Sequence, residues 1–593
     1  MLKRFFVYWS VNDVSLICIG LMFFLPFINM HHVRPLPVFY SEWVAALMGL
    51  VAIGVQLGSS VWLKLTHSIK IPQVSLIFVG LAAILCVQWA LGILQSNQYA
   101  LLALSYLTWA FLMVAIGGHL RAKLGLQKSA VYLAYCLVIA ASVNVLIVVL
   151  QFVARTGGVV PFLPNLSSFG AVAQANHFAS FISLGITSLI YLHAKGYFSK
   201  SFFYLLLILF IFLLSFSGSR SAWLYLITII IFTYILRADY IKQEKTVNFV
   251  HVAKKTALWL LPMFALVQLF IYFVIPSKLV NLPTERLLDA VAAPSQSMRL
   301  QFWYDSIRIF LESPWLGVGT GKFMASTFLL IDTPTALSSK LVFEHAHNLF
   351  LHLLAEMGVV AVLIVFGGLF AWVKGFKWRA LNLETWWLIC LLSIISIHSL
   401  LEYPLWFAFF LGIFSVLLGF GDENTISIQL GVISKKMIRG TLALLLILGS
   451  VNLGTMLVAN IKLENWIEKF TNKSISDVAE LNWVRKYSLL SPTGQHMYAL
   501  TMAIDSKHIR ENLTDSQSVM SFRPNGIVAY QYALLLQLNC RHEDAIKQLN
   551  RALLAYPRNF KIVSENAPVE YRQEYLNLFS EVKQANTNKS NEK

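Results

Sequence analysis

The stretch Ser129–Val153, SAVYLAYCLVIAASVNVLIVVLQFV, decides the fold because it contains no charged side chain. A helix of about 20 apolar residues crosses the hydrocarbon core of a bilayer, which is about 30 Å thick. Backbone polar groups in lipid must be hydrogen-bonded within the segment, and a helix meets this requirement. The stretch therefore predicts a transmembrane helix.

The same apolar pattern recurs along most of the chain. Hydrophobic residues make up 57% of the sequence, charged residues make up 13%, and the mean hydropathy is +0.66. These values exclude a soluble globular protein. The expected fold class is an all-α polytopic membrane protein with about 13 transmembrane helices, within a range of about 12 to 14. The expected spans are 12–30, 41–61, 73–94, 99–118, 129–153, 176–193, 201–217, 221–236, 256–275, 347–373, 383–400, 404–420 and 440–459.

Lysine and arginine residues in the loops predict the orientation of the chain. Short cytoplasmic loops keep positive charge, whereas long translocated segments are nearly indifferent to it. With the N-terminus inside, the short outer loops hold only Arg34, Arg155 and Arg220. This distribution predicts a bacterial inner-membrane protein with a cytoplasmic N-terminus and a periplasmic C-terminal segment.

The net charge of +17 comes largely from these loop residues, so nucleic-acid binding is not expected. The first apolar segment is long enough to span and lacks a small-residue cleavage site, so we expect it to remain as the first helix. The five cysteines form no disulfide or zinc pattern. No cofactor is expected.

Four regions are expected along the chain. They are transmembrane helices at 1–275, a large periplasmic loop with an amphipathic helix at 276–346, transmembrane helices at 347–459, and a periplasmic helical tail at 460–593.

The tail is expected to resemble a tetratricopeptide (TPR) unit. Tyr530–Pro557 predicts two helices, with Ala533, Ala545 and Ala552 where such a unit has small residues. One unit cannot bury its own face, so further helices from about 476–520 should pack on it. Two interpretations stay open: a helical domain without a partner, and a docking site for a protein acceptor.

Polar residues gather in the segments predicted to face outward. Arg34 lies in the first outer loop, and Gln174, Asn176 and His177 open the span at 176–193. Such residues at a membrane boundary either cap a helix or contact a polar ligand, and the sequence leaves both interpretations open.

Two arginines are candidates for contact with phosphate. Arg220 lies in a tight turn between two spans, where it either reaches lipid headgroups or presents its guanidinium to phosphate oxygens. Arg299 lies in the segment 297–310, where Leu300, Trp303, Ile307 and Phe310 predict the apolar face of an amphipathic helix on the membrane surface.

The densest polar stretch is Glu344-His345-Ala346-His347-Asn348, at the start of the span 347–373. Free N–H groups and the helix dipole favour an anion at such a start. Two histidines could chelate a metal, but no third ligand follows at the usual spacing, so no metal is expected. Glu402 and Tyr403 precede the span 404–420 at the same predicted depth.

In this order, the motifs resemble the bacterial O-antigen ligase and polymerase superfamily, and above all its protein O-oligosaccharyltransferase branch. The resemblance is carried by Arg34–Pro37, Gln174–His177, Ser219–Arg220, Arg299, Pro314–Gly319, His347–Asn348 and Glu402–Pro404. It implies a GT-C-like membrane fold. It also implies en bloc transfer of a preassembled oligosaccharide from undecaprenyl pyrophosphate to Ser or Thr hydroxyls of a periplasmic protein such as pilin.

The resemblance implies a role for each matching residue. The implied catalytic residues are His347, Gln174 and Tyr403. The implied donor-binding residues are Arg220, Arg299, Arg34 and Asn348. The implied supporting residues are Glu402, His177 and Asn176. His347 could be a general base toward the acceptor hydroxyl or a protonated phosphate ligand, and the sequence leaves both roles open.

Other functions compete with this interpretation. An O-antigen ligase acting on lipid A core, or a repeat-unit polymerase, would use the same outer site, whereas the periplasmic tail favours a protein acceptor. A lipid or solute transporter is the alternative from another class. A transporter should show inverted repeats or midplane charges in both halves, but the polar groups here gather on one predicted side.

Overall fold

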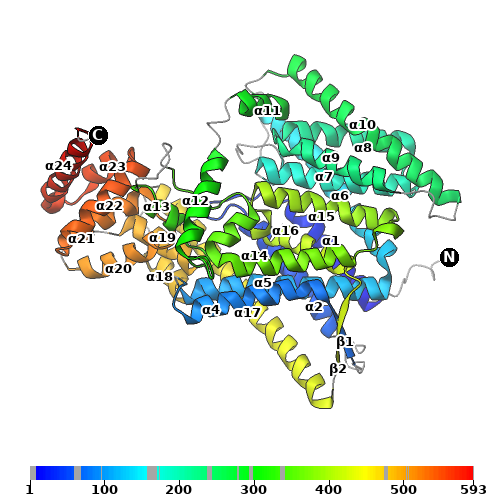
Figure 1. Cartoon of the computed structure of the whole chain (residues 1–593), viewed down its shortest axis with the longest axis horizontal. Helices are drawn as coiled ribbons and strands as arrows, with labels where there is room; N and C mark the ends of the chain where they lie inside the picture. Colours follow the sequence, from blue (N-terminus) through cyan, green and yellow to red (C-terminus); the bar gives the residue numbers. More distant parts are fainter. Residues whose placement is uncertain are drawn as a thin grey trace. The chain divides into compact units, whose positions relative to one another are not determined.

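The computed structural model of the chain describes residues 9–58, 68–94, 96–155, 170–172, 174–236, 244–276, 279–292, 298–333, 341–429, 431–472, 478–502, 504 and 507–591. The described residues are mostly helical and belong to two compact units (Figure 1). Unit 1 comprises residues 1–80, 105–297 and 365–454. Unit 2 comprises residues 81–104, 298–364 and 455–593.

The elements that lie within unit 1 are α1 (Val11–Phe24), η2 (Leu25–Phe27), α2 (Phe39–Leu57), β1 (Ser68–Pro72), η3 (Gln73–Ser75), α6 (Leu126–Arg155), α7 (Ala175–Ala194), α8 (Lys200–Phe216), α9 (Ser221–Ile235), α10 (Glu244–Val274), α11 (Pro283–Ala292), η5 (Trp378–Ala380), α15 (Leu383–Leu401), η6 (Pro404–Trp406), α16 (Ala408–Gly421) and β2 (Thr425–Gln429). Those within unit 2 are α12 (Met298–Glu312), α13 (Phe323–Leu329), α18 (Val478–Tyr487), α19 (Ser491–Thr501), α20 (Ile509–Met520), α21 (Gly526–Leu538), α22 (His542–Ala555), α23 (Asn559–Asn566) and α24 (Val569–Asn591). Four helices contribute residues to both units: α4 (Leu76–Ala90), α5 (Asn97–Leu124), α14 (Leu349–Gly375) and α17 (Val432–Thr471).

Every span expected from the sequence coincides with a helix. Among the described residues, 9 helices are long and apolar enough to cross a membrane. The shorter apolar helices Val11–Phe27, Lys200–Phe216, Ser221–Ile235 and Ala408–Gly421 coincide with the remaining expected spans. The chain is therefore a multi-pass membrane protein, while the number of crossings and their direction stay predictions.

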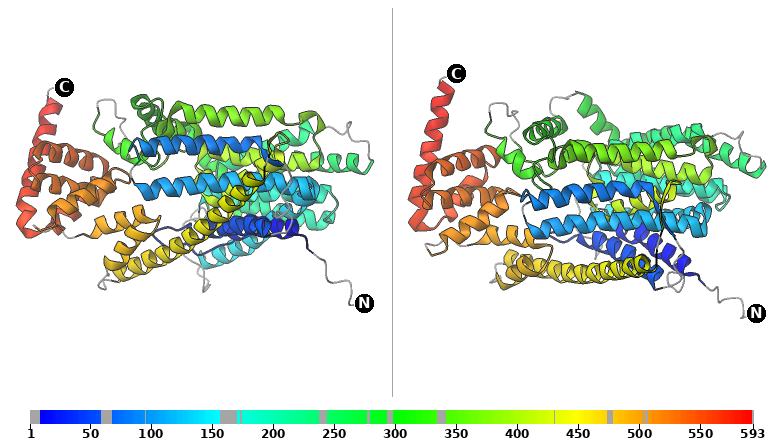
Figure 2. Two further views of the ribbon diagram at one scale, coloured as in Figure 1. Left: turned by 90° about the horizontal axis from the view of Figure 1, so that it is seen from below. Right: turned by 60° about the horizontal axis from the view of Figure 1, so that its bottom comes forward.

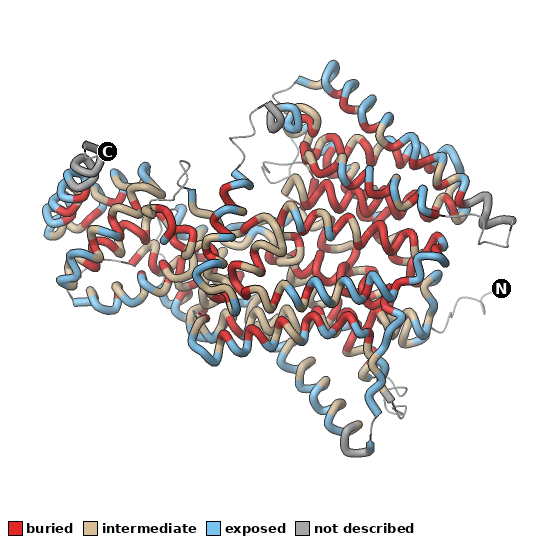
Figure 3. Tube along the Cα trace, viewed as in Figure 1, coloured by how far each residue is buried: buried red, intermediate tan, exposed pale blue. Residues whose placement is uncertain are grey.

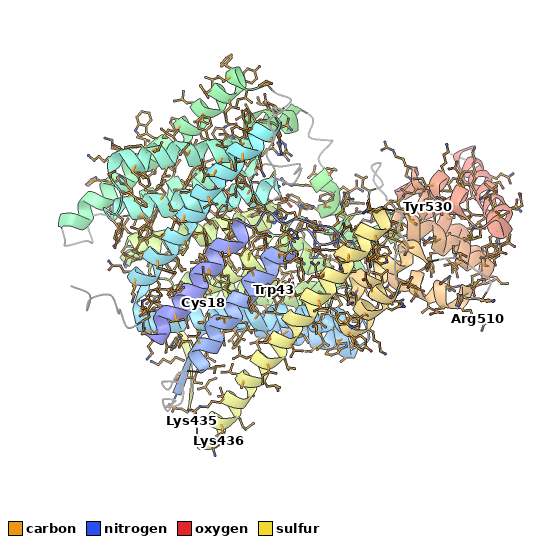
Figure 4. All side chains as sticks on the ribbon, turned by 180° about the vertical axis from the view of Figure 1, so that it is seen from behind. Cys18, Trp43, Lys435, Lys436, Arg510 and Tyr530 are labelled. Carbon is orange, nitrogen blue, oxygen red and sulfur yellow. The ribbon has the colours of Figure 1, made fainter. Side chains whose placement is uncertain are left out.

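Large apolar side chains on the outside of unit 1 agree with a lipid environment. Leu258, Leu266 and Phe273 of α10 are more than half exposed, as are Leu444 and Ile447 of α17. Water is a poor solvent for such a surface, whereas lipid is a good one. Lys435 and Lys436 lie at the N-terminal end of α17 (Figure 4).

Helix α7 forms the centre of unit 1, packed by α6, α8, α9 and α15 (Figure 1). It is buried along nearly all of its length (Figure 3). Its polar side chains are satisfied inside the helix, because the Ser183 and Thr187 hydroxyls each donate at 2.8 Å to the carbonyl one turn earlier. Trp387 of α15 donates its indole N–H to the Ser188 hydroxyl at 2.9 Å.

A two-stranded antiparallel ribbon accompanies the helices. Strand β1 pairs with β2 in the register Ser68 to Gln429 and Pro72 to Thr425. Apolar and polar residues alternate in each strand, as in Ile69-Lys70-Ile71, which is typical of a strand. The ribbon escapes prediction because each strand is a short piece of a loop between apolar spans.

The C-terminal helices of unit 2, α18 to α24, form a helical domain that is coloured orange to red in Figure 2. Helices α21 and α22 are the pair predicted from Tyr530–Pro557, and Ala533, Ala545 and Ala552 are fully buried between their neighbours. The Tyr530 hydroxyl, labelled in Figure 4, donates to the Tyr556 carbonyl at 3.1 Å. The assignment of the pair to the TPR class remains a prediction.

Candidate active site

Gln174 is the N-cap of α7. Its side-chain oxygen accepts the His177 backbone N–H at 2.6 Å, which satisfies one of the free donors at the start of the helix. Of the two interpretations that the sequence left open, the structure shows the cap. A catalytic role for Gln174 would rest on its side-chain N–H groups.

Asn176 joins three segments that are far apart in the sequence. Its side-chain N–H donates to the Glu402 carboxylate at 2.6 Å, and its side-chain oxygen accepts the Ser219 hydroxyl at 2.6 Å. Glu402 and Ser219 are both buried. The amide therefore has one orientation, and it places the turn before Arg220 next to the segment that carries Tyr403.

His177 lies in an aromatic pocket on the other side of the same turn of α7. Its ring centroid is 4.9 Å from those of His398 and Phe407 and 6.1 Å from that of Tyr403. His177 and His398 are buried. Five of the predicted residues thus gather at one end of α7 in unit 1: Gln174, Asn176, His177, Glu402 and Tyr403.

Arg220 is the residue directly before α9, at the end of the turn 217–220. A second arginine, Arg286 of α11, donates from Nη1 to the Gly218 carbonyl at 2.8 Å and so fixes this turn. Sequence analysis missed Arg286. Its only signal is its place in a helix that starts with Pro283, and nothing in that pattern indicates a contact with a turn 68 residues earlier.

The loop between η2 and α2 is held near the entry to α7. His32 contacts the Pro37 carbonyl through Nδ1 at 2.8 Å and the Ala171 carbonyl through Nε2 at 2.6 Å. Carbonyl oxygens only accept, so both hydrogen bonds form together when the ring carries two protons. Arg34, in the same loop, is exposed.

In unit 2, the motif Pro314–Gly321 docks against the first turns of α14. Val318 donates its N–H to the Ala355 carbonyl, and Gly319 donates to the Glu356 carbonyl, both at 3.0 Å. Helix α14 has a kink at Gly358, whose φ of 76° is in the left-handed region. The motif is therefore a backbone clamp on the kinked start of α14.

Gly317 shows why the clamp needs glycine. Its φ is +68°, and an added Cβ would lie 2.2 Å from the Glu356 carbonyl carbon and 2.4 Å from the Met357 nitrogen. Both neighbours are backbone atoms, which cannot rotate away. The glycine-rich pattern in this motif therefore serves close backbone packing.

His347 lies just before α14, and this corrects the expected start of the helix at 347. Helix α14 begins at Leu349, because Asn348 caps it by accepting the Leu351 N–H at 3.2 Å. His347 has a φ of +51°, one of two positive values among the described non-glycine residues. Its ring stacks on Phe302 of α12 with a centroid distance of 4.9 Å.

Helix α12 coincides with the predicted helix, and Leu300 and Ile307 of its expected apolar face are exposed. Its buried side includes the polar residues Gln301, Asp305 and Ser306. Its exposed side carries the apolar residues Met298, Leu300, Ile307 and Leu311 and also Tyr304. Polar groups turned inward beside Phe302 and apolar groups turned outward fit a helix that lies against lipid. Burial raises the pKa of the Asp305 carboxyl.

The C-terminal domain contacts both described segments that precede His347, which end at Thr333 and begin again at Leu341. Arg523 forms an ion pair with Glu344 at 3.1 Å, and Arg551 forms one with Asp332 at 3.0 Å. Phe328 of α13 belongs to the apolar core of the same domain. These contacts lie within unit 2, so this domain and the His347 segment share one core.

No group of three or more His, Cys, Asp or Glu side chains that could hold a metal ion occurs among the residues described. The predicted residues divide between the units: Arg299, His347 and Asn348 belong to unit 2, and the other seven belong to unit 1.

Comparison with known proteins shows which families the chain is similar to. Residues 205–366 match the O-antigen ligase family, residues 386–568 match the C-terminal region of a virulence factor membrane-bound polymerase family, and residues 169–193 match the protein glycosylation ligase family. The general O-oligosaccharyltransferase of Acinetobacter baylyi is 24% identical over 88% of this chain and 89% of its own length. The chain is similar to the O-antigen ligase superfamily, and within it most like the protein O-oligosaccharyltransferase branch.

A second relative has the same kind of name. The ComP-specific O-oligosaccharyltransferase of Acinetobacter baylyi is 24% identical over 63% of this chain and 64% of its own length. In this chain, Arg220, Arg299 and His347 all fall inside the O-antigen ligase match, and Gln174 falls inside the glycosylation ligase match.

Proposed function

We propose that this chain transfers a preassembled oligosaccharide en bloc from undecaprenyl pyrophosphate to Ser and Thr hydroxyls of periplasmic proteins such as pilin. Both relatives are O-oligosaccharyltransferases by name, which supports glycosyl transfer to protein. The observation that carries the proposal is the backbone of His347, which is left-handed at the entry to α14. A non-glycine residue there costs about 1 to 2 kcal/mol, and such strain gathers at active sites.

In the proposed step, the acceptor oxygen attacks the anomeric carbon of the donor sugar. The bond between that carbon and the pyrophosphate oxygen breaks, and its electron pair leaves with undecaprenyl pyrophosphate. His347 takes the proton of the attacking hydroxyl as general base. If His347 is instead a protonated phosphate ligand, the proton goes to the leaving pyrophosphate.

Cationic and N–H groups stabilise the negative charge that develops on the leaving pyrophosphate. We assign this role to Arg220, Arg299 and Arg34, whose guanidinium groups match phosphate oxygens. We also assign donor binding to Asn348, whose side-chain oxygen caps α14. We assign catalytic roles to Gln174 and Tyr403 as well, supported by Asn176, His177 and Glu402.

The reaction is proposed to need no divalent metal, since these guanidinium groups supply the positive charge. Activity that survives complete chelation with EDTA supports this, and activity restored only by Mg²⁺ or Mn²⁺ contradicts it.

We also propose that the chain lies in the inner membrane with its N-terminus in the cytoplasm. Labelling of single cysteines placed at Arg34 and at Lys436 tests it, because only the first should react with an impermeant reagent in intact spheroplasts.

An O-antigen ligase activity toward lipid A core is the second candidate, favoured by the match at 205–366. Purified protein in proteoliposomes, supplied with lipid-linked oligosaccharide, separates the two. Pilin and lipid A core are offered together in equal amounts. Glycan on Ser or Thr of pilin supports the proposal, and glycan found only on lipid A core contradicts it.

A further inference from the structure

Two ionisable residues that the proposed reaction does not use are buried in the first two turns of α14. His352 and Glu356 are each 3% exposed. They lie one helical turn apart, and His352 Nε2 is 3.3 Å from the Glu356 carboxylate. A carboxylate is rarely buried without donors aimed at it, so the position of this pair calls for an explanation.

The His352–Glu356 pair is hydrogen-bonded to the residue before His347. The Ala346 backbone N–H donates to His352 Nδ1 at 3.3 Å. Because Nδ1 accepts this bond, the ring proton of neutral His352 sits on Nε2, where it faces Glu356. The other carboxylate oxygen of Glu356 accepts the Phe323 backbone N–H at 3.0 Å. Glu356 therefore sets both the tautomer and the position of the His352 ring.

Gln88 anchors the same turn of α14 from a third segment. Its side-chain N–H group contacts the Glu356 carbonyl at 2.7 Å and the Leu316 carbonyl at 2.6 Å. Its side-chain oxygen accepts the Thr320 hydroxyl at 2.8 Å. Gln88 is fully buried, so the turn that carries Glu356 is tied to the clamp 314–321.

From these contacts we infer that His352, oriented by Glu356, is a positioning residue that holds His347 in its left-handed conformation. The inference rests on the proposed role of His347. A left-handed non-glycine residue persists only where its surroundings impose it, and the bond from Ala346 to His352 fixes the peptide between His345 and Ala346, one residue before His347. If this bond is lost, His347 relaxes and its imidazole leaves its place on Phe302.

Two variants of His352 separate this role from simple packing. In His352→Asn, the side-chain oxygen occupies the place of Nδ1 and still accepts the Ala346 N–H. In His352→Gln, the amide reaches the place of Nε2 and still contacts Glu356, but the acceptor for Ala346 is gone. Each variant thus keeps one of the two contacts of His352, either with Ala346 or with Glu356.

The experiment measures transfer by full-length protein in proteoliposomes, with lipid-linked oligosaccharide as donor. A displacement of about 1 Å at a reacting group can cost about 100-fold in rate. We therefore expect kcat to fall about 100-fold in His352→Gln and less than about 10-fold in His352→Asn, with the donor KM unchanged in both. Equal kcat values for the two variants, or a rise in KM in place of the fall in kcat, would overturn the inference.

Two controls keep the outcome separate from that of the proposed function. The thermal unfolding midpoints of the two variants should agree, because each variant removes one buried hydrogen bond. A lower midpoint for His352→Gln alone would show that His352 has only a structural role, and would overturn the inference. His347→Ala is measured alongside. If His347→Ala transfers at the wild-type rate, the proposed function of His347 is wrong. If it is inactive while His352→Gln is fully active, only the positioning inference is wrong.

Discussion

Substitution of Gly317 by alanine tests the clamp between the motif 314–321 and α14. Alanine at φ +68° costs about 1 to 2 kcal/mol. Its Cβ would also meet the Glu356 carbonyl carbon at 2.2 Å, so the segment must move away. That movement breaks the hydrogen bonds of Val318 and Gly319 to α14, worth about 0.5 to 1.5 kcal/mol each. The total destabilisation is about 2 to 5 kcal/mol.

Gly92→Ala is a matched control for this prediction. Gly92 has the same φ of +68°, but nothing lies within 4 Å of its added Cβ. This variant therefore carries only the backbone cost. The thermal unfolding midpoint of each purified variant in detergent, followed by fluorescence-detected size exclusion, should fall further for Gly317→Ala. Equal shifts for the two variants would refute the clamp.

Three further predictions concern other parts of the chain. Asn176→Asp places a carboxylate where the amide contacts Glu402 at 2.6 Å. We therefore expect a loss of about 2 to 3 kcal/mol in stability and a loss of transfer. A variant as stable and active as wild type would show that the hydrogen bond between Asn176 and Glu402 is dispensable. Arg220→Lys keeps the charge but loses the planar guanidinium group, so the KM for the donor should rise about tenfold. The control variant Arg155→Lys should leave this KM unchanged. Identical KM values for the two variants would remove Arg220 from the donor site. Burial, and then the charge of Arg523, lower the pKa of His496 in α19 to about 4. The unfolded chain binds this proton near pH 6.5, so His496 stabilises the fold less as the pH falls from about 6.5 to about 4, by up to about 3 kcal/mol. The thermal midpoint of His496→Leu should accordingly fall less with acid than that of wild type, and parallel pH curves would contradict this.

The transmembrane helices could be predicted from the sequence because a long apolar segment in lipid must form a helix to satisfy its backbone hydrogen bonds. Residues 129–153, for example, lie inside α6 with a few residues added at each end. The start of α14 was less predictable, since the cap on Asn348 decides whether His347 belongs to the helix. The strands β1 and β2 stabilise each other across more than 300 residues of sequence, and neither carries enough apolar pattern alone.

The candidate site could be predicted only in part. Sequence order indicated Asn176, Glu402 and Arg220, and the structure brings Asn176 and Glu402 together with the turn before Arg220. The residues that hold the site in place could not be predicted from the sequence. Gln88 acts on a helix 268 residues away, and no local pattern marks a buried glutamine in an apolar span as an anchor. Likewise, the sequence does not predict the packing role of the glycines of 314–321, because the backbone of α14 against which they pack is absent from any local sequence window.

The most direct test of the proposed transfer is the intact mass of an acceptor protein after incubation with lipid-linked oligosaccharide. Wild-type protein should add the mass of one complete oligosaccharide per modified Ser or Thr in a single step. His347→Ala, inserted in the membrane at the same level, should add none. Stepwise addition of single sugars, or the full mass added by His347→Ala at the wild-type rate, would contradict the account.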